Sequence, residues 1–176
     1  LSNVVIATME SHSPYGLIKN GAIVIDGSNI SWVGTLAELP TKYKKLEEID
    51  LKGRVVTPAL IDCHTHIVHG GNRANEFEMR LNGASYEEVS KAGGGIISTV
   101  NHTRESSEND LLTGALKRVD ALISEGVGTI EIKSGYGLDI GSEIKMLKVA
   151  RLIESKRPIN IKTSFVGAHA IPSEFK

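Results

Sequence analysis

The sequence predicts an α/β fold in which a small β layer, residues 1–54, precedes parallel β/α units, residues 55–176. Short β-type runs separated by turn residues fill the first segment. From Val55 onward strand-like and helix-like patterns alternate, which is typical of parallel β/α units. An apolar strand pattern also ends in two histidines within residues 57–66, where such folds carry functional side chains.

The N-terminal segment is predicted to form the β layer. Three strands are expected, at residues 4–7, 22–25 and 30–33. The sequence DGSN at residues 26–29 favours a hairpin turn between the last two of them. Trp32 is expected to pack in this layer, and His12, in a loop with serine and proline, is expected to be solvated.

The second segment shows clear helix signals. Ser85 and Glu88 have the spacing of a capping box, so a short helix should begin here and end at the glycines 93–95. A longer helix follows the cap at residues 107–110 and stops at Gly126. Its apolar stripe consists of Leu111, Leu112, Ala115, Leu116, Val119, Leu122 and Ile123. Further elements are expected as strands at 129–133 and 161–166 and a helix at 144–153.

Composition narrows the class of protein. Of the 176 residues, 40% are hydrophobic and 23% charged, and the net charge is −1, which favours neither a nucleic-acid partner nor an anionic membrane. No apolar run approaches the roughly 18 residues of a membrane span. The single cysteine excludes an internal disulfide and so favours a reducing, cytoplasmic compartment.

The histidine pair is the strongest chemical signal. Side chains alternate along a strand, so His64 and His66 should project together while Cys63 and Thr65 point away. Two neutral imidazoles placed in this way can hold a divalent metal ion. A surface strand that carries two histidines by chance is the alternative. Cys63, directed away from the pair, is expected to be a packed strand residue.

Other polar side chains follow the later strands of the same pattern. Tyr136 comes after the strand at 129–133, and His169 comes after the strand at 161–166. Because parallel β/α units place their functional groups at the carboxyl ends of the strands, we expect both to meet His64 and His66 at one mouth.

These blocks resemble a known family. Residues 57–66, TPALIDCHTH, are similar to the first barrel strand of the amidohydrolase superfamily, with Ala59 where that superfamily usually has glycine. The alanine fits ordinary β geometry. Later blocks resemble the imidazolonepropionase family of this superfamily, at residues 70–78, 83–86, 93–96, 131–138 and 167–170.

The resemblance implies a partial (β/α)8 TIM-type barrel in residues 55–176, preceded by part of a small β-sandwich domain in residues 1–54. A closed barrel takes about 250 residues. The chain is shorter, and neither Leu1 nor Lys176 resembles a natural terminus, so we expect the N-terminal portion of a longer enzyme.

The resemblance also implies an activity: hydrolysis of the cyclic amide of 4-imidazolone-5-propanoate to N-formimidoyl-L-glutamate. One metal ion, zinc or iron, would be held by His64 and His66. Arg73 would grip the propionate of the substrate, with Tyr136 and His169 as further substrate contacts; in some superfamily members the position of His169 binds metal instead. The remaining ligands and the proton-transfer aspartate would lie beyond Lys176, so these 176 residues alone should be inactive.

Two other interpretations stay open. Another cyclic amidohydrolase or a deaminase of the superfamily would share His64 and His66 but not Arg73, Tyr136 and His169 together. A non-catalytic metal-binding or assembly fragment would pair through its open sheet edge, and a homodimer is compatible with either enzyme reading.

Overall fold

A computed structural model describes residues 1–10 and 13–175 of the chain. The chain divides into two compact units, Leu1–Pro58 and Ala59–Lys176. Each unit contains its own sheet. His12, which the sequence predicts to be solvated, lies outside the described residues.

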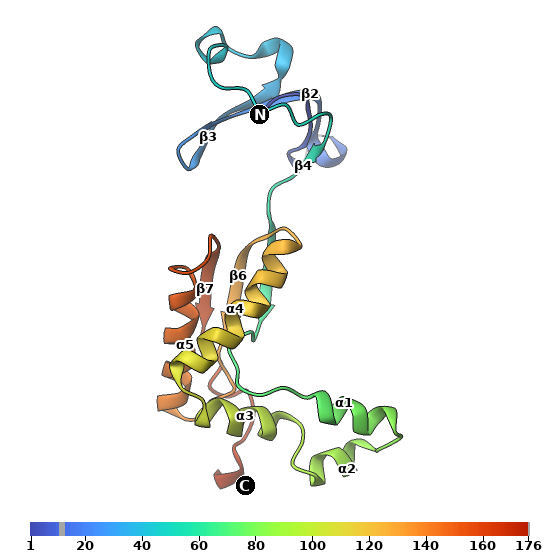
Figure 1. Cartoon of the computed structure of the whole chain (residues 1–176), viewed down its shortest axis with the longest axis vertical. Helices are drawn as coiled ribbons and strands as arrows, with labels where there is room; N and C mark the ends of the chain where they lie inside the picture. The colour runs from blue at the N-terminus through green and yellow to red at the C-terminus, as the bar shows by residue number, and fades with distance from the viewer. Residues whose placement is uncertain (11–12, 176) are drawn as a thin grey trace. The chain divides into compact units, whose positions relative to one another are not determined.

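The first unit is built on a four-stranded sheet with the order β3-β2-β1-β4 (Figure 1). Its strands are β1 (Val4–Ala7), β2 (Leu17–Asp26), β3 (Asn29–Thr35) and β4 (Val55–Val56). The strands β1, β2 and β3 pair antiparallel, and β4 lies parallel to β1. Asp26 pairs with Asn29 across a tight turn, so the predicted hairpin is confirmed.

A small apolar core holds this sheet together. Val4, Ile6 and Ile23 are buried side by side, because alternate residues of β1 and β2 face the same side of the sheet. Trp32 is half-buried, and its ring lies over Gly34 of the same strand. Short 3₁₀ turns occur at Pro14–Gly16, Leu36–Glu38, Thr41–Tyr43 and, in the second unit, Ser173–Phe175.

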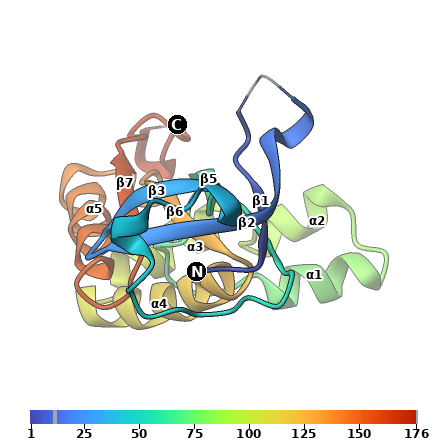
Figure 2. The same cartoon turned by 90° about the horizontal axis from the view of Figure 1, so that it is seen from above.

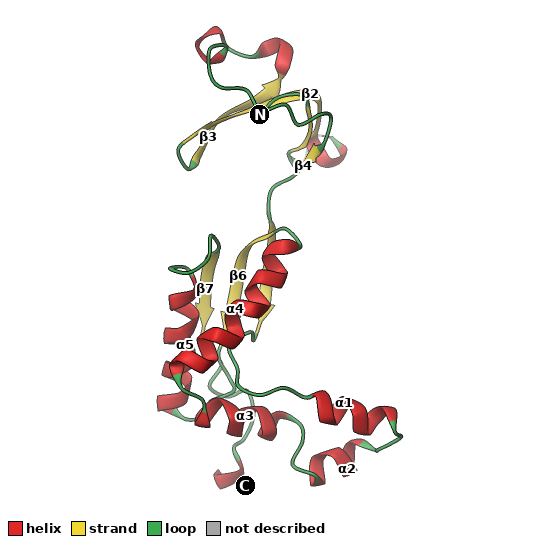
Figure 3. Cartoon of the chain, viewed as in Figure 1, coloured by secondary structure: helices red, strands yellow, loops and turns green. Residues whose placement is uncertain are grey.

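The second unit contains a parallel three-stranded sheet with the order β5-β6-β7. Its strands are β5 (Leu60–Thr65), β6 (Val127–Lys133) and β7 (Asn160–Ser164). Helices connect the strands in the described part of the chain (Figure 3). Between β5 and β6 lie α1 (Ala74–Leu81), α2 (Tyr86–Lys91), α3 (Ile96–Glu105) and α4 (Glu108–Ser124), and between β6 and β7 lies α5 (Ile140–Ile153). The predicted β/α alternation is therefore present as a mixed α/β arrangement.

The core of this unit lies between the sheet and the helices α4 and α5, which lie alongside it in Figures 1 and 2. Leu111, Ala115 and Val119 of the predicted stripe are buried there, and its other members pack against the same cluster. The helix starts as predicted, because the Ser107 hydroxyl accepts the backbone N–H of Asp110. The stripe and its cap are thus confirmed.

The β5–β6 connection was only partly predicted. Ser85 and Glu88 do form the capping box of α2. Two further helices, α1 and α3, have no counterpart among the elements that the sequence predicts. Figures 1 and 2 show α1 and α2 extending away from the sheet, and the large apolar side chains of α1 are left uncovered: Phe77 is 65% and Leu81 72% exposed.

His102 lies within α3, where it is exposed. Gly95 begins that helix without a side-chain cap, so the sequence carries no start signal there. Within the described residues, no helix combines the length and apolar character that crossing a membrane requires.

Candidate functional site

The two histidines of the metal-type motif lie at the carboxyl end of β5. The pairing of β5 with β6 shifts register between Asp62 and Thr65, which marks an irregularity of the β-bulge type. Beyond it the Thr65 hydroxyl donates to the backbone oxygen of Glu131 at 2.8 Å and fixes the strand end. The rings of His64 and His66 lie 5.5 Å apart between centroids, so the predicted pair is brought together.

The same irregularity overturns the expectation for Cys63. This residue is exposed, whereas Thr65, two positions along, is buried. A bulge interrupts the regular alternation on which the expectation depended, and β5 is an edge strand of the three-stranded sheet. Cys63 is therefore not a packed strand residue.

Side chains from three strand ends meet around His66. Its ring is stacked on that of His169, with 4.7 Å between centroids and 10° between planes. Tyr136 lies 5.3 Å from both His66 and His169. His69 approaches Tyr136 edge-on at 6.1 Å. The convergence expected from parallel strand ends is thus observed for His66, Tyr136 and His169.

His66 has the chemistry of a neutral ligand. Burial, followed by the neighbouring His169 and His64 imidazoles, lowers its pKa below the ordinary value. Its Nδ1 atom is buried and finds no hydrogen-bond partner among the described residues. A neutral imidazole with an unused nitrogen is what a metal ion binds. The described residues contain no group of three or more histidine, cysteine or carboxylate side chains able to hold a metal.

The Tyr136 loop, residues 134–138, connects β6 to α5. Tyr136 is half-buried against the core of the unit, and the Ser134 hydroxyl accepts the Val166 backbone N–H at 3.1 Å, which joins the ends of β6 and β7. Gly135 has a φ of 117°, and a Cβ atom there would lie 2.7 Å from Nδ1 of His169. Glycine is needed because His169 sits against the backbone.

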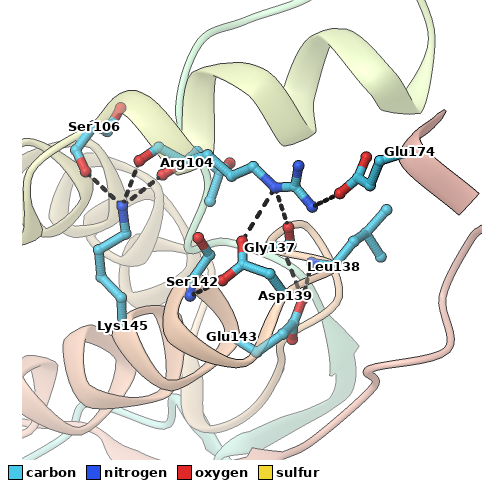
Figure 4. A network of polar contacts seen from close by, with 10 residues as sticks. Arg104, Ser106, Gly137, Leu138, Asp139, Ser142, Glu143, Lys145 and Glu174 are labelled. Atoms are coloured by element: carbon cyan, nitrogen blue, oxygen red, sulfur yellow. Dashed lines mark hydrogen bonds and ion pairs between the residues drawn. The ribbon is translucent and has the colours of Figure 1, made fainter. Parts of the chain in front are cut away.

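Sequence reasoning missed a buried carboxylate behind this loop. Glu143, in the first turn of α5, is 2% exposed and accepts backbone N–H groups of the Tyr136 loop. The signal that could have indicated it is an acidic residue close behind Gly135 and Gly137, at the start of a helical pattern. Carboxylates are favoured near helix N-termini. Figure 4 shows Glu143 reaching the loop from α5.

Arg73 lies apart from the ring cluster. It is the residue before α1, and its Nε donates to the Thr99 hydroxyl at 3.0 Å. It lines a pocket of about 350 Å³ together with Glu76, whose Oε1 is buried and has no hydrogen-bond partner among the described residues. Burial lowers the pKa of His69, and the charges of Arg118 and Arg73 lower it further.

Lys133 is engaged at the end of β6. Its ammonium forms an ion pair with Glu131, and the Ser164 hydroxyl donates to the same carboxylate. These hydrogen bonds, that of Lys133 first, lower the pKa of Glu131. Lys133 is therefore held by an ion pair at the end of β6.

The chain is similar to curated imidazolonepropionases along nearly its whole length. Residues 47–126 match the amidohydrolase family. The relative from Roseobacter denitrificans is 62% identical over 99% of this chain and 44% of its own length. That from Ruegeria pomeroyi is 59% identical over 98% of this chain and 43% of its own length. That from Paracoccus denitrificans is 56% identical over 100% of this chain and 44% of its own length.

The chain therefore spans less than half the length of these relatives. Among solved structures, the crystal structure of A. niger ochratoxinase aligns with a TM-score of 0.56 at 18% identity, covering 91% of this chain and 29% of that one. At this identity the likeness concerns the fold alone.

Proposed function

We propose, on the premise that this chain belongs to the amidohydrolase superfamily as a homologue of imidazolonepropionases, that the full-length protein hydrolyses 4-imidazolone-5-propanoate. The cyclic amide would open to N-formimidoyl-L-glutamate, a step of histidine degradation. The observation that carries the proposal is the meeting of His66, Tyr136 and His169 at the carboxyl ends of three parallel strands.

The chain's own contribution to a metal site would be His64 and His66. The buried, unpartnered Nδ1 of His66 and its lowered pKa fit a neutral imidazole ligand. A bound zinc or iron ion supplies a water of lowered pKa and polarises the amide carbonyl. The remaining ligands and the proton-transfer group would come from the portion of the relatives that this chain does not span.

Substrate recognition would fall to Arg73, Tyr136 and His169. The guanidinium of Arg73 presents a planar pair of donors that suits the propionate carboxylate. Its Nε is occupied by Thr99, so the terminal nitrogens are the ones directed to a ligand. The Tyr136 phenol can donate a hydrogen bond to the imidazolone ring, and His169, stacked beside His66, can contact the same ring.

Several structural expectations belong to the same proposal. The sheet β5-β6-β7 with its helices would form the first part of a (β/α)8 barrel, residues 55–176. The sheet β3-β2-β1-β4 would belong to a β-sandwich domain, to which the sequence assigns residues 1–54. A small-molecule substrate, a cytoplasmic location and a homodimer stay predictions.

The direct test is an assay of the purified full-length protein with 4-imidazolone-5-propanoate, following formation of N-formimidoyl-L-glutamate. His66→Ala should abolish stoichiometric metal and turnover together, because a metal site needs about four ligands. His102→Ala is a matched control for metal content, since this exposed histidine lies on α3 and its ring nitrogen contacts the Ser98 backbone oxygen. Turnover of dihydroorotate or of an amino-substituted ring in place of the imidazolone would favour a different amidohydrolase.

A further inference from the structure

Glu143 is a buried carboxylate whose oxygens are used by backbone N–H groups of the Tyr136 loop. Its Oε2 accepts from Gly135 at 2.8 Å. Its Oε1 accepts from Gly137 at 2.7 Å and from Leu138 at 2.8 Å (Figure 4). Burying a carboxylate is costly unless hydrogen bonds compensate it. Three charge-assisted bonds and the N-terminal end of α5 provide that compensation.

These bonds fix the two residues on either side of Tyr136. The Gly135 N–H is bound to Glu143, while its carbonyl oxygen lies 2.9 Å from Nδ1 of His169. The Gly137 N–H is bound to the second oxygen of the same carboxylate. One carboxylate therefore sets the backbone of Tyr136 from both sides and, through the carbonyl of Gly135, the position of His169.

A second group fixes the loop from the opposite side. Arg104 Nε donates to the Gly137 backbone oxygen at 2.6 Å and lies 3.2 Å from Oδ2 of Asp139, the residue that caps α5 (Figure 4). A Cβ atom at Gly137 would lie 2.6 Å from the backbone nitrogen of Glu143. The loop is thus seated directly on the first turn of α5, with little room to shift.

We propose that Glu143 is a positioning residue for substrate recognition. It places Tyr136 by holding the backbone on both sides of that residue, and it places His169 through the carbonyl oxygen of Gly135. The expected change in KM rests on the proposed function. The expected change in the backbone of the Tyr136 loop does not. Glu143→Gln keeps the volume of the side chain. It offers one acceptor oxygen in place of two, so its amide group must face a backbone N–H that it cannot accept.

Kinetics of the full-length enzyme provide the first readout. Glu143→Gln should raise the KM for the imidazolone about 10-fold or more, with a smaller change in kcat. The metal content should not change, because His64 and His66 lie at the end of β5 and not on the Tyr136 loop. The matched control is Glu154→Gln, at the other end of α5, where Oε1 accepts the Ile161 backbone N–H at 2.7 Å. This variant should leave the KM unchanged.

A double-mutant cycle separates positioning from general destabilisation. Glu143→Gln is also introduced into a Tyr136→Phe background, which lacks the phenol. The factor by which it raises the KM there should be at least about three times smaller than the factor in the wild type. An equal rise in both backgrounds would overturn the inference. If Glu143→Gln does not fold, Arg104→Gln loosens the hold on Gly137 from the more exposed side, and the same cycle applies.

Amide hydrogen exchange tests the structural consequence without any substrate. In Glu143→Gln, the amides of Gly135, Gly137 and Leu138 should exchange faster than in the wild type and in Glu154→Gln. Unchanged exchange would refute the role of Glu143. If the wild-type full-length protein does not hydrolyse the imidazolone but Glu143→Gln still exchanges faster, the proposed function is refuted. Glu143 then remains the residue that fixes this loop.

Discussion

The substitution Arg73→Lys tests how the substrate carboxylate is recognised. In the structure Arg73 Nε donates to the Thr99 hydroxyl at 3.0 Å, and this bond orients the guanidinium plane. Lysine keeps the positive charge but has neither the planar pair of donors nor the Nε that reaches Thr99. The substitution therefore changes geometry and leaves charge constant.

The expected cost follows from the bonds that are lost. One charge-assisted hydrogen bond to a carboxylate is worth roughly 1.5–3 kcal/mol. At 1.36 kcal/mol for each factor of ten, kcat/KM should fall about 10- to 150-fold if the contact persists in the transition state. Thr99→Val removes only the hydrogen bond that orients Arg73 and leaves the terminal nitrogens of the guanidinium in place, so its cost should be smaller, about 2- to 10-fold.

The assay compares two substrates with the full-length enzyme: 4-imidazolone-5-propanoate and an analogue without the carboxylate. Arg73→Lys should reduce kcat/KM for the acid and have little effect on the analogue, whose partner group is already absent. Metal content should not change, because Arg73 lies outside the ring cluster. If both substrates lose equally, Arg73 holds the start of α1 and does not bind the carboxylate.

Three further predictions follow from individual contacts. Lys145→Met removes the ammonium that donates to three backbone oxygens at the end of α3, so the free energy of unfolding in urea should fall by about 1.5–3 kcal/mol; no change would mean that water replaces these bonds. Ser107→Ala removes the hydroxyl that accepts the backbone N–H of Asp110 at the start of α4, and it should lower the free energy of unfolding by about 1 kcal/mol in the same experiment. The pKa of His66 is lowered from 6.5 by burial and by neighbouring imidazoles, so an NMR titration of the metal-free protein should give a midpoint below 6.5. Because the unfolded state binds this proton more readily, the group reduces stability as the pH falls below 6.5, and a midpoint above 6.5 would contradict the effect of burial.

Local signals in the sequence were sufficient to predict much of the secondary structure of the second unit. The stripe from Leu111 to Ile123 and the cap at Ser107 specify α4 through side chains close together along the chain. The meeting of His66, Tyr136 and His169 was also predictable, because the carboxyl ends of parallel strands lie at one edge of a sheet. Residue type and position along the strands carried this information.

Other features depended on contacts between distant segments. The helices α1 and α3 are short, with 8 and 10 residues, and neither begins with a side-chain cap, so the start signal that marks α4 is absent from both. The exposure of Cys63 depends on an irregular register against β6, which only strand pairing creates. Arg73 and Thr99 are 26 positions apart, and only the fold brings them into contact.

Glu143 illustrates the division most clearly. The sequence places an acidic residue directly before the predicted helix at 144–153 and glycines on both sides of Tyr136. Only the tertiary structure decided that this carboxylate turns inward and takes three backbone N–H groups, because the loop must first be seated on the helix. A buried charge is stable only where the completed fold supplies its hydrogen bonds, and those bonds join segments whose approach no local pattern records.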